Sequence, residues 1–176
     1  MDRKSFDKVC EIIKNYQPQN YAEIGVHNGL TAAGICREIL KYKPDLHFVG
    51  YDAFDEVPAV EHNGKSPSTN KHYEKCLWRF SGLKKDNPQF TWELVKGLTI
   101  DTLTTPVKYD FVYIDGGHSY ETVKHDYNMV KESKIILFDD YNLKDVKKAI
   151  SEIGKGELLA SYDDWKKATW LIINED

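Results

Sequence analysis

Hydrophobic residues gather in short apolar runs that recur along the chain between polar or turn-forming residues. The runs cover residues 21–24, 47–51, 91–95, 110–114 and 135–138. Runs of this length, rich in β-branched and aromatic side chains, are typical of buried strands. The pattern therefore predicts five strands up to Phe138.

The segments around these runs carry apolar residues three or four positions apart, which is the period of one helical face. Such stripes are formed by Phe6, Val9, Ile13 and Tyr16, by Leu30, Ala33, Ile39 and Leu40, by Tyr120, Val123, Tyr127 and Val130, and by Leu143, Val146, Ile150 and Ile153. Ser119 is placed to cap the third of these helices and Asn142 the fourth. Strands thus alternate with helices.

This alternation, with strands that are apolar throughout, favours a parallel sheet covered on both faces. Right-handed crossovers make a doubly wound, Rossmann-like α/β sheet the simplest topology. The last two apolar segments, 158–162 and 169–173, flank a polar turn and are expected to add an antiparallel C-terminal hairpin at the sheet edge. The sequence predicts a mostly parallel seven-stranded sheet in one domain over residues 1–176.

Composition narrows the range of partners. Of the 176 residues, 41% are apolar or aromatic, which is enough for one core without a disulfide or metal staple. A net charge of −4 and a pI near 5.9 offer no basic surface to nucleic acid or to an anionic membrane. Cys10, Cys36 and Cys76 are odd in number and far apart, so we expect buried thiols rather than disulfides or a zinc site.

No apolar run approaches the roughly 20 residues of a membrane helix, and the first residues do not lead into a signal-peptide core. We therefore expect a cytoplasmic protein with a small-molecule partner, no nucleic-acid partner and no membrane partner, and a homo-oligomer stays open. The lysines between Lys71 and Lys85 are expected on the solvated face of a helix.

The first two strands end in residues that suit a nucleoside, because ligands of a parallel sheet bind at the carboxyl ends of its strands. The first strand leads from Glu23 into Gly25 and Gly29. Gly25 permits a tight turn and close ligand approach, and Gly29 lets the next helix direct its free amide groups at the ligand. Glu23 can reach an amine or a hydroxyl. Asp52 follows the second strand, where its carboxylate can accept both hydroxyls of a ribose.

Each of these features has a simpler explanation when it is taken alone, since any tight turn needs glycine and aspartate often begins a turn. Their combination favours a nucleoside. The Gly-x-Gly-x-x-Gly loop that holds a pyrophosphate is absent, and this disfavours a dinucleotide.

Three aspartates follow the fourth and fifth strands, with Asp115 after one and Asp139 and Asp140 after the other. Carboxylates at one sheet edge repel one another unless they share a cation, and oxygen ligands suit Mg²⁺, Mn²⁺ or Ca²⁺. Helix capping is the alternative role for such aspartates, but Asn142 already fills the capping position of the last helix. We expect Asp115, Asp139 and Asp140 to hold a divalent metal.

His118 lies three residues beyond Asp115 and just before a helix. A neutral imidazole beside the metal can take the proton of a substrate hydroxyl, so we expect His118 and Asp115 to be catalytic. The segment 55–70 is rich in Pro, Gly, Ser and Asn without a hydrophobic period, as is typical of a lid or of a simple insertion. His62 within this segment and His72 just after it could contact substrate.

These residues together resemble the class I S-adenosylmethionine-dependent methyltransferases, in particular the methyltransferase domain 24 family. They are also similar to metal-dependent sugar O-methyltransferases of macrolide biosynthesis. The resemblance spans residues 21–138, and the stretch Tyr113-Ile114-Asp115-Gly116-Gly117-His118-Ser119-Tyr120 is its most specific part. It implies a Rossmann-like sheet with an appended antiparallel edge, S-adenosylmethionine as cofactor, and Mg²⁺ or Mn²⁺ in the metal-dependent branch.

Carried over by position, the resemblance assigns Glu23, Gly25 and Gly29 to the methionine part of the cofactor, Asp52 to its ribose, Asp115, Asp139 and Asp140 to the metal, and His118 to the general base. His27 is a departure, since it stands where the family often has a further glycine. The acceptor pocket is left to the segment 55–70 and the first helix.

The resemblance thus implies a metal-assisted O-methyltransferase that acts on a hydroxyl of a sugar or another small molecule, with vicinal hydroxyls as the best chelators. Two alternatives stay open, namely a nicotinamide-dependent oxidoreductase on a similar sheet and a non-catalytic nucleoside-binding module without an acceptor site. A metal-dependent hydrolase would also use carboxylates and His118, but it would not need the glycine turn and Asp52.

Overall fold

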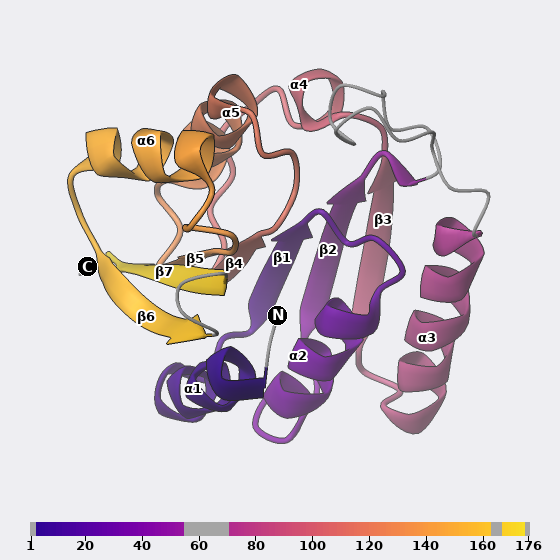
Figure 1. Cartoon of the computed structure of the whole chain (residues 1–176). Helices are drawn as coiled ribbons and strands as arrows, with labels where there is room; N and C mark the ends of the chain where they lie inside the picture. Colours follow the sequence, from indigo (N-terminus) through magenta and orange to yellow (C-terminus); the bar gives the residue numbers. More distant parts are fainter. Residues whose placement is uncertain (1–2, 55–70, 163–166, 175–176) are drawn as a thin grey trace.

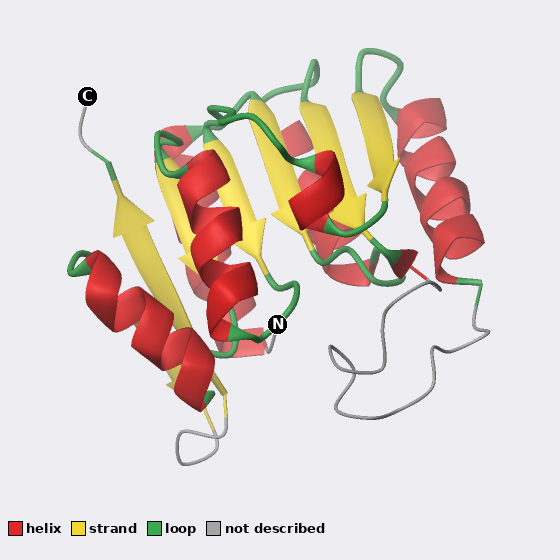
Figure 2. Cartoon of the chain, turned by 90° about the horizontal axis from the view of Figure 1, so that it is seen from above, coloured by secondary structure: helices red, strands yellow, loops and turns green. Residues whose placement is uncertain are grey.

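The computed structural model describes residues 3–54, 71–162 and 167–174 and contains one mixed sheet with helices on both faces (Figures 1 and 2). The strands are β1 (Asn20–Ile24), β2 (His47–Asp52), β3 (Thr91–Lys96), β4 (Phe111–Ile114), β5 (Ile135–Phe138), β6 (Glu157–Tyr162) and β7 (Lys167–Ile173). The helices are α1 (Arg3–Tyr16), α2 (Leu30–Leu40), α3 (His72–Asp86), α4 (Thr99–Thr102), α5 (Tyr120–Val130) and α6 (Lys144–Ile153).

The strand order in the sheet is β3-β2-β1-β4-β5-β7-β6. The five strands from β3 to β5 pair in parallel, whereas β7 pairs antiparallel with both β5 and β6. The strand order reverses at β1, which lies between β2 and β4, so a ligand is expected at the carboxyl ends of these strands. The predicted doubly wound, seven-stranded sheet with an antiparallel C-terminal edge is confirmed.

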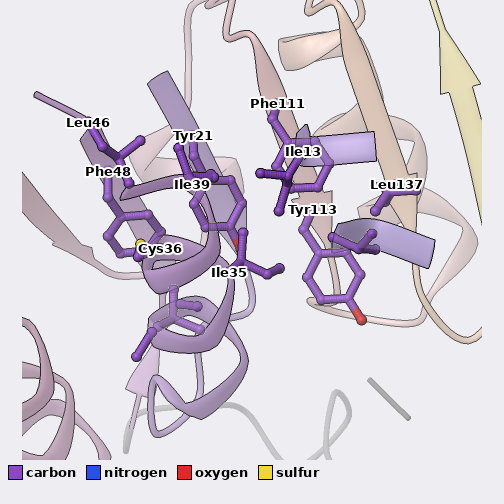
Figure 3. Packing of buried hydrophobic residues seen from close by; sticks show 14 of the residues in the cluster. Ile13, Tyr21, Ile35, Cys36, Ile39, Leu46, Phe48, Phe111, Tyr113 and Leu137 are labelled. Carbon is purple, nitrogen blue, oxygen red and sulfur yellow. The ribbon is translucent and has the colours of Figure 1, made fainter. Parts of the chain in front are cut away.

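Two apolar cores cover the two faces of the sheet, because alternate residues of each strand point to opposite sides. Tyr21 and Phe111 belong to the core beneath α1, α2 and α3, whereas Ala22 and Val112 belong to the core beneath α5 and α6. Figure 3 shows the first core, where large side chains of β1, β2, β4 and β5 pack against α1 and α2.

Of the two predicted helix caps, Ser119 is confirmed and Asn142 is wrong. The Ser119 hydroxyl accepts a hydrogen bond from the Thr122 N–H at 3.2 Å, as expected for a capping serine. Asn142 does not cap α6, because the chain enters that helix one residue later, with Leu143 at the cap position and without a side-chain cap. Among the described residues, Asn142 Oδ1 is instead buried without a hydrogen-bond partner.

Two further expectations have mixed outcomes. Cys36 and Cys76 are buried free thiols, but Cys10 is only partly covered. The segment 55–70, predicted to be a long loop, lies outside the described residues, as does His62. Within the described part of the chain, every helix is too short or too polar to cross a bilayer.

The parallel ladder continues one residue beyond four strands and brings the predicted site residues to one level. The N–H groups of Gly25 and Asp115 donate to Tyr51 and Ile24 at 2.8 Å. In the same way, the Gly97 N–H donates to the backbone carbonyl of Asp52 at 3.0 Å, and the Asp139 N–H donates to the backbone carbonyl of Ile114 at 2.9 Å. Residues that are far apart in sequence therefore meet along one edge of the sheet.

Candidate active site

A cavity of about 810 Å³ opens at the carboxyl ends of β1, β2 and β4. Its volume falls within the range of small-molecule and cofactor sites. Of the residues predicted from the sequence, Glu23, Gly25, Asp52, Asp115 and His118 line it. Gly29, Asp139 and Asp140 are not among the lining residues.

Gly25 lines the cavity in the turn after β1, directly against Asp115 in the turn after β4. It has φ +91°, and a Cβ atom there would lie 2.1 Å from the backbone oxygen of Asp115. A side chain at this position is therefore excluded both by the left-handed backbone and by the neighbouring strand end. Glycine at this position therefore allows the backbone of the turn after β1 to approach the backbone of the turn after β4 closely.

Glu23 lies at the bottom of the cavity and is 1% exposed. Burial raises the pKa of its carboxyl well above the ordinary value, although a hydrogen bond from the Tyr21 hydroxyl acts in the opposite direction. A cationic group placed beside Glu23 would favour its ionised form. The residue thus suits a ligand that carries an amine.

Asp52 ends β2 and holds the turn after β1. Its Oδ2 accepts the His27 N–H at 2.6 Å, and its Oδ1 accepts the Phe54 N–H. Burial raises the pKa of Asp52, while the two backbone hydrogen bonds act in the opposite direction. Each carboxylate oxygen has a second lone pair, so Asp52 can accept ligand hydroxyls without giving up these bonds.

His27 and His72 form a ring pair on the wall of the cavity next to Asp52. Their ring centroids lie 4.0 Å apart, and both residues line the cavity. His27 has φ +53°, a conformation that glycine adopts more easily. The expectation that His72 faces the ligand site agrees with this position, whereas the sequence gives no sign that the two rings meet.

Gly29 supports the site from behind. It has φ +75° at the start of α2, and a Cβ atom there would lie 2.9 Å from Cys76 Sγ. This contact with α3 gives a packing reason for glycine at the position. Its own amide group donates to the Val26 carbonyl at 2.8 Å. The first residues of α2 after it, Leu30 and Thr31, line the cavity.

Asp115, His118 and Asp140 form the group of potential metal ligands that the structure brings together in the described residues. One potential ligand atom from each residue lies within 4.8 Å of the others. His118 Nε2 is 3.1 Å from Asp140 Oδ2. Carboxylate oxygens with one imidazole nitrogen suit a divalent cation such as Mn²⁺ or Mg²⁺.

Asp139, which the sequence suggests as the third carboxylate ligand, has a different environment. It is 7% exposed, and its Oδ2 accepts the Tyr113 hydroxyl at 2.7 Å. Its Oδ1 accepts the Thr169 hydroxyl at 3.3 Å. Burial, with the nearby Asp115 and Asp139, raises the pKa of Tyr113, which keeps this phenol a donor.

The electrostatics of this corner are unfavourable without a cation. Burial raises the pKa of Asp115 to about 7, and the charges of Asp139 and Asp140 add to the shift, while His118 acts in the opposite direction. Three ionised carboxyl groups at one edge repel one another unless positive charge is shared among them. The expected gathering of acidic groups is therefore found, with His118 as an additional member.

One side of the cavity was missed by the sequence analysis. Thr122, His125 and Asp126 of α5 line it, and Asp126 is fully buried. These residues lie three and four positions apart, which puts them on a common helical face. The apolar stripe of α5 is the stronger signal in the sequence, although the helical spacing of these polar residues is also present there.

Comparison with protein families gives one match, to the model described as a methyltransferase domain, over residues 22–141. This match confirms the resemblance inferred from the sequence. None of the curated proteins matches the chain.

Solved structures of O-methyltransferases have the same fold. The O-methyltransferase from Bacillus cereus in complex with SAH aligns with a TM-score of 0.66 and 13% identity over 99% of this chain and 82% of that one. TomG from Streptomyces achromogenes, in complex with SAM, gives 0.64 and 12% over 99% and 82%. The calicheamicin methyltransferase CalS11 gives 0.70 and 16% over 94% and 76%.

Proposed function

The chain belongs to the methyltransferase domain family, and on that premise we propose that it transfers the methyl group of S-adenosylmethionine to a hydroxyl of a small molecule. A divalent metal, Mg²⁺ or Mn²⁺, assists the transfer. The observation that carries the proposal is one cavity with Glu23 and Asp52 on one side and Asp115 and His118 on the other. A site for the cofactor thus adjoins a site for an activated oxygen.

The cofactor side of the cavity fits S-adenosylmethionine by the chemistry of its donors and acceptors. The Asp52 carboxylate would accept the ribose hydroxyls, and Glu23 would face the amine of the methionine part. Gly25 leaves the space between them free of a side chain. The B. cereus structure contains SAH and the TomG structure contains SAM, which supports the same ligand class here.

Two observations support a divalent cation on the metal side of the cavity. Potential ligand atoms of Asp115, His118 and Asp140 lie within 4.8 Å of one another, close enough to share one cation. Burial and the neighbouring carboxylates raise the pKa of Asp115 to about 7, and a bound cation would relieve that repulsion. Asp115 and Asp140 would hold the metal, with Asp139 behind them.

A bound divalent metal would supply a Lewis acid for a substrate hydroxyl, and bound S-adenosylmethionine would supply a methyl group activated by its sulfonium. His118 Nε2 lies 3.1 Å from Asp140 Oδ2 and donates to that carboxylate. His118 would therefore accept the hydroxyl proton at its other ring nitrogen, Nδ1, and Asp140 would stabilise the imidazolium that results. The oxygen–methyl bond forms as the carbon–sulfur bond breaks, and the electron pair of that bond goes to sulfur. The cavity walls align these groups.

Vicinal hydroxyls, as on a sugar or a catechol, are the acceptors that this arrangement favours, since two neighbouring oxygens can reach one cation. The nicotinamide-dependent oxidoreductase is disfavoured by the family to which the chain belongs. The non-catalytic module remains as a second candidate and differs in a measurable way. It would bind the cofactor and transfer no methyl group in a screen of hydroxyl, amine and thiol acceptors.

The experiment is a methyl-transfer assay with S-adenosylmethionine and a panel of sugars and catechols, run with Mg²⁺, with EDTA, and with Asp115→Ala. We expect transfer to a vicinal diol that is lost with EDTA, restored by excess Mg²⁺ and absent in the variant. Full transfer in EDTA and in Asp115→Ala would remove the metal from the mechanism. Thermal unfolding of Asp115→Ala serves as the control that the variant is folded.

A further inference from the structure

The carboxylate of Asp139 is held in place from two neighbouring strands. The Tyr113 hydroxyl of β4 donates to its Oδ2 at 2.7 Å, and the Thr169 hydroxyl of β7 donates to its Oδ1 at 3.3 Å. The shorter bond, from Tyr113, has the distance of a strong O–H···O contact, and the longer bond is weaker. Of these two bonds, the one from Tyr113 holds the carboxylate more strongly.

Both donors are shielded from water. Tyr113 is fully buried in the core beneath α1 and α2, and Thr169 is 1% exposed. Figure 3 shows the Tyr113 ring among apolar side chains, with its hydroxyl oxygen at the end of the side chain away from Phe111. The ring cannot turn its hydroxyl toward solvent without disturbing this packing, so the donor is fixed by the core.

The held carboxylate lies beside the potential metal ligands. Tyr113 pairs with Leu137 in the parallel register of β4 and β5, so two residues further on Asp115 and Asp139 are neighbours across the same two strands. The Asp139 N–H also donates to the Ile114 carbonyl at 2.9 Å, which sets Asp139 beside Asp115. A cation bound by Asp115 would therefore lie in the field of Asp139 as well.

We propose that Tyr113 is a positioning residue for the divalent metal, because its hydroxyl fixes the Asp139 carboxylate behind the group formed by Asp115, His118 and Asp140. The inference rests on the proposed function and deepens its metal half. Groups that orient a metal site from behind its ligands commonly contribute a factor of about 10–100 to metal affinity. Loss of the Tyr113 hydroxyl removes the shorter of the two hydroxyl bonds to Asp139.

The test is titration of Mn²⁺ alone into the purified wild-type protein and into Tyr113→Phe, followed by calorimetry and by the electron paramagnetic resonance signal of free Mn²⁺. We expect Tyr113→Phe to weaken Mn²⁺ binding by about 10- to 100-fold. Thr169→Val is expected to weaken it less, because it removes the longer bond. S-adenosylhomocysteine affinity of Tyr113→Phe is expected to stay within about two-fold of wild type.

Tyr21→Phe is the matched control, since Tyr21 is an equally buried tyrosine on the adjacent strand whose hydroxyl donates to Glu23. It should leave Mn²⁺ affinity unchanged. The inference is overturned if Tyr113→Phe binds Mn²⁺ like wild type, or if Tyr21→Phe loses as much affinity. If the wild-type protein binds no Mn²⁺, both the inference and the metal half of the proposed function fail. If the wild-type protein binds Mn²⁺ and only the Tyr113→Phe result is contrary, the inference alone fails.

Discussion

His118 Nε2 lies 3.1 Å from Asp140 Oδ2, and this contact joins the ends of two neighbouring parallel strands, β4 and β5. The side chain of His118 is 40% exposed and that of Asp140 is 23% exposed, so an acceptor can reach the imidazole from the cavity. Asp140 has φ +52°, and this turn brings its carboxylate toward β4. The pair is the proposed proton acceptor with its carboxylate partner.

Replacement of His118 by Asn removes the proposed base and keeps a polar side chain. We expect kcat for methyl transfer to fall by roughly 10²–10⁴, with the Kd for S-adenosylhomocysteine within about two-fold of wild type. His47→Asn is the control, because His47 lies at the opposite end of β2 and contacts Thr91. Equal rates for His118→Asn and wild type would show that another group takes the proton.

Replacement of Asp52 by Asn tests the cofactor side. An amide can accept at one atom only, so the variant loses acceptor capacity for the ribose hydroxyls and for one backbone N–H. We expect S-adenosylhomocysteine to bind about 10- to 100-fold more weakly in calorimetry, which corresponds to roughly 1.5–3 kcal/mol. Asp45→Asn, at an exposed site that accepts from Gln19, should not change the affinity. Unchanged binding by Asp52→Asn would remove Asp52 from the cofactor site.

Gly25→Ala tests the contact between the turns after β1 and β4. The added methyl would lie 2.1 Å from the Asp115 backbone oxygen at a residue with φ +91°, so the two turns must separate. We expect a loss of more than about 3 kcal/mol in the free energy of unfolding, measured with urea. Gly82→Ala, where no atom lies within 4 Å of the added carbon, should stabilise α3 by up to about 1 kcal/mol. Similar stability of both variants would contradict the model of the turn.

Asp115→Asn tests the electrostatics of the metal-free site. The pKa of Asp115 rises from its ordinary value of 3.8 to about 7 in the folded protein. The folded state therefore binds a proton more tightly than the unfolded chain between pH 4 and 7, and the stability of the metal-free protein falls as the pH rises through that window. Asp115→Asn escapes this loss and should be more stable at pH 8 by roughly 2 kcal/mol, or about 5 °C in Tm.

The difference in Tm between Asp115→Asn and wild type should shrink as the pH is lowered from 8 to 5. Saturating Mg²⁺ should reverse it at pH 8, because the metal binds the ionised carboxylate of the wild type and stabilises the folded state. A pH-independent difference, or no response of the wild type to Mg²⁺, would contradict the proposed electrostatics.

Much of the fold could be predicted because the two signals that carry it are local. The strand near Phe111 is apolar on both faces, and the stripe through Val123 and Tyr127 has helical period, so neither depends on distant contacts. The cap at Asn142 failed because the chain needs additional residues after Asp140 to turn from β5 into α6. Turn geometry of this kind depends on tertiary contacts that sequence periodicity does not report.

The candidate site was predictable to the level of strand ends and no further. Position at a strand end predicted that Asp52 and Asp115 face the cavity, which both residues line. It could not distinguish the surroundings of Asp139 from those of Asp140, which are adjacent in sequence. That distinction depends on the hydroxyls of Tyr113 and Thr169, which are 26 and 30 residues from Asp139 and reach it through the pairing of β5 with β4 and with β7. The contact between His27 and His72 is likewise set by the placement of α3.

A crystal structure of the wild-type protein grown with S-adenosylhomocysteine and Mn²⁺, with anomalous data collected at the manganese edge, tests the central claim most directly. We predict one manganese peak bound by Asp115 and Asp140, with the ribose hydroxyls of the ligand on Asp52 in the same cavity. Ligand density away from Asp52, or a bound ligand with no manganese peak near Asp115, would contradict the account of a metal-assisted methyltransferase.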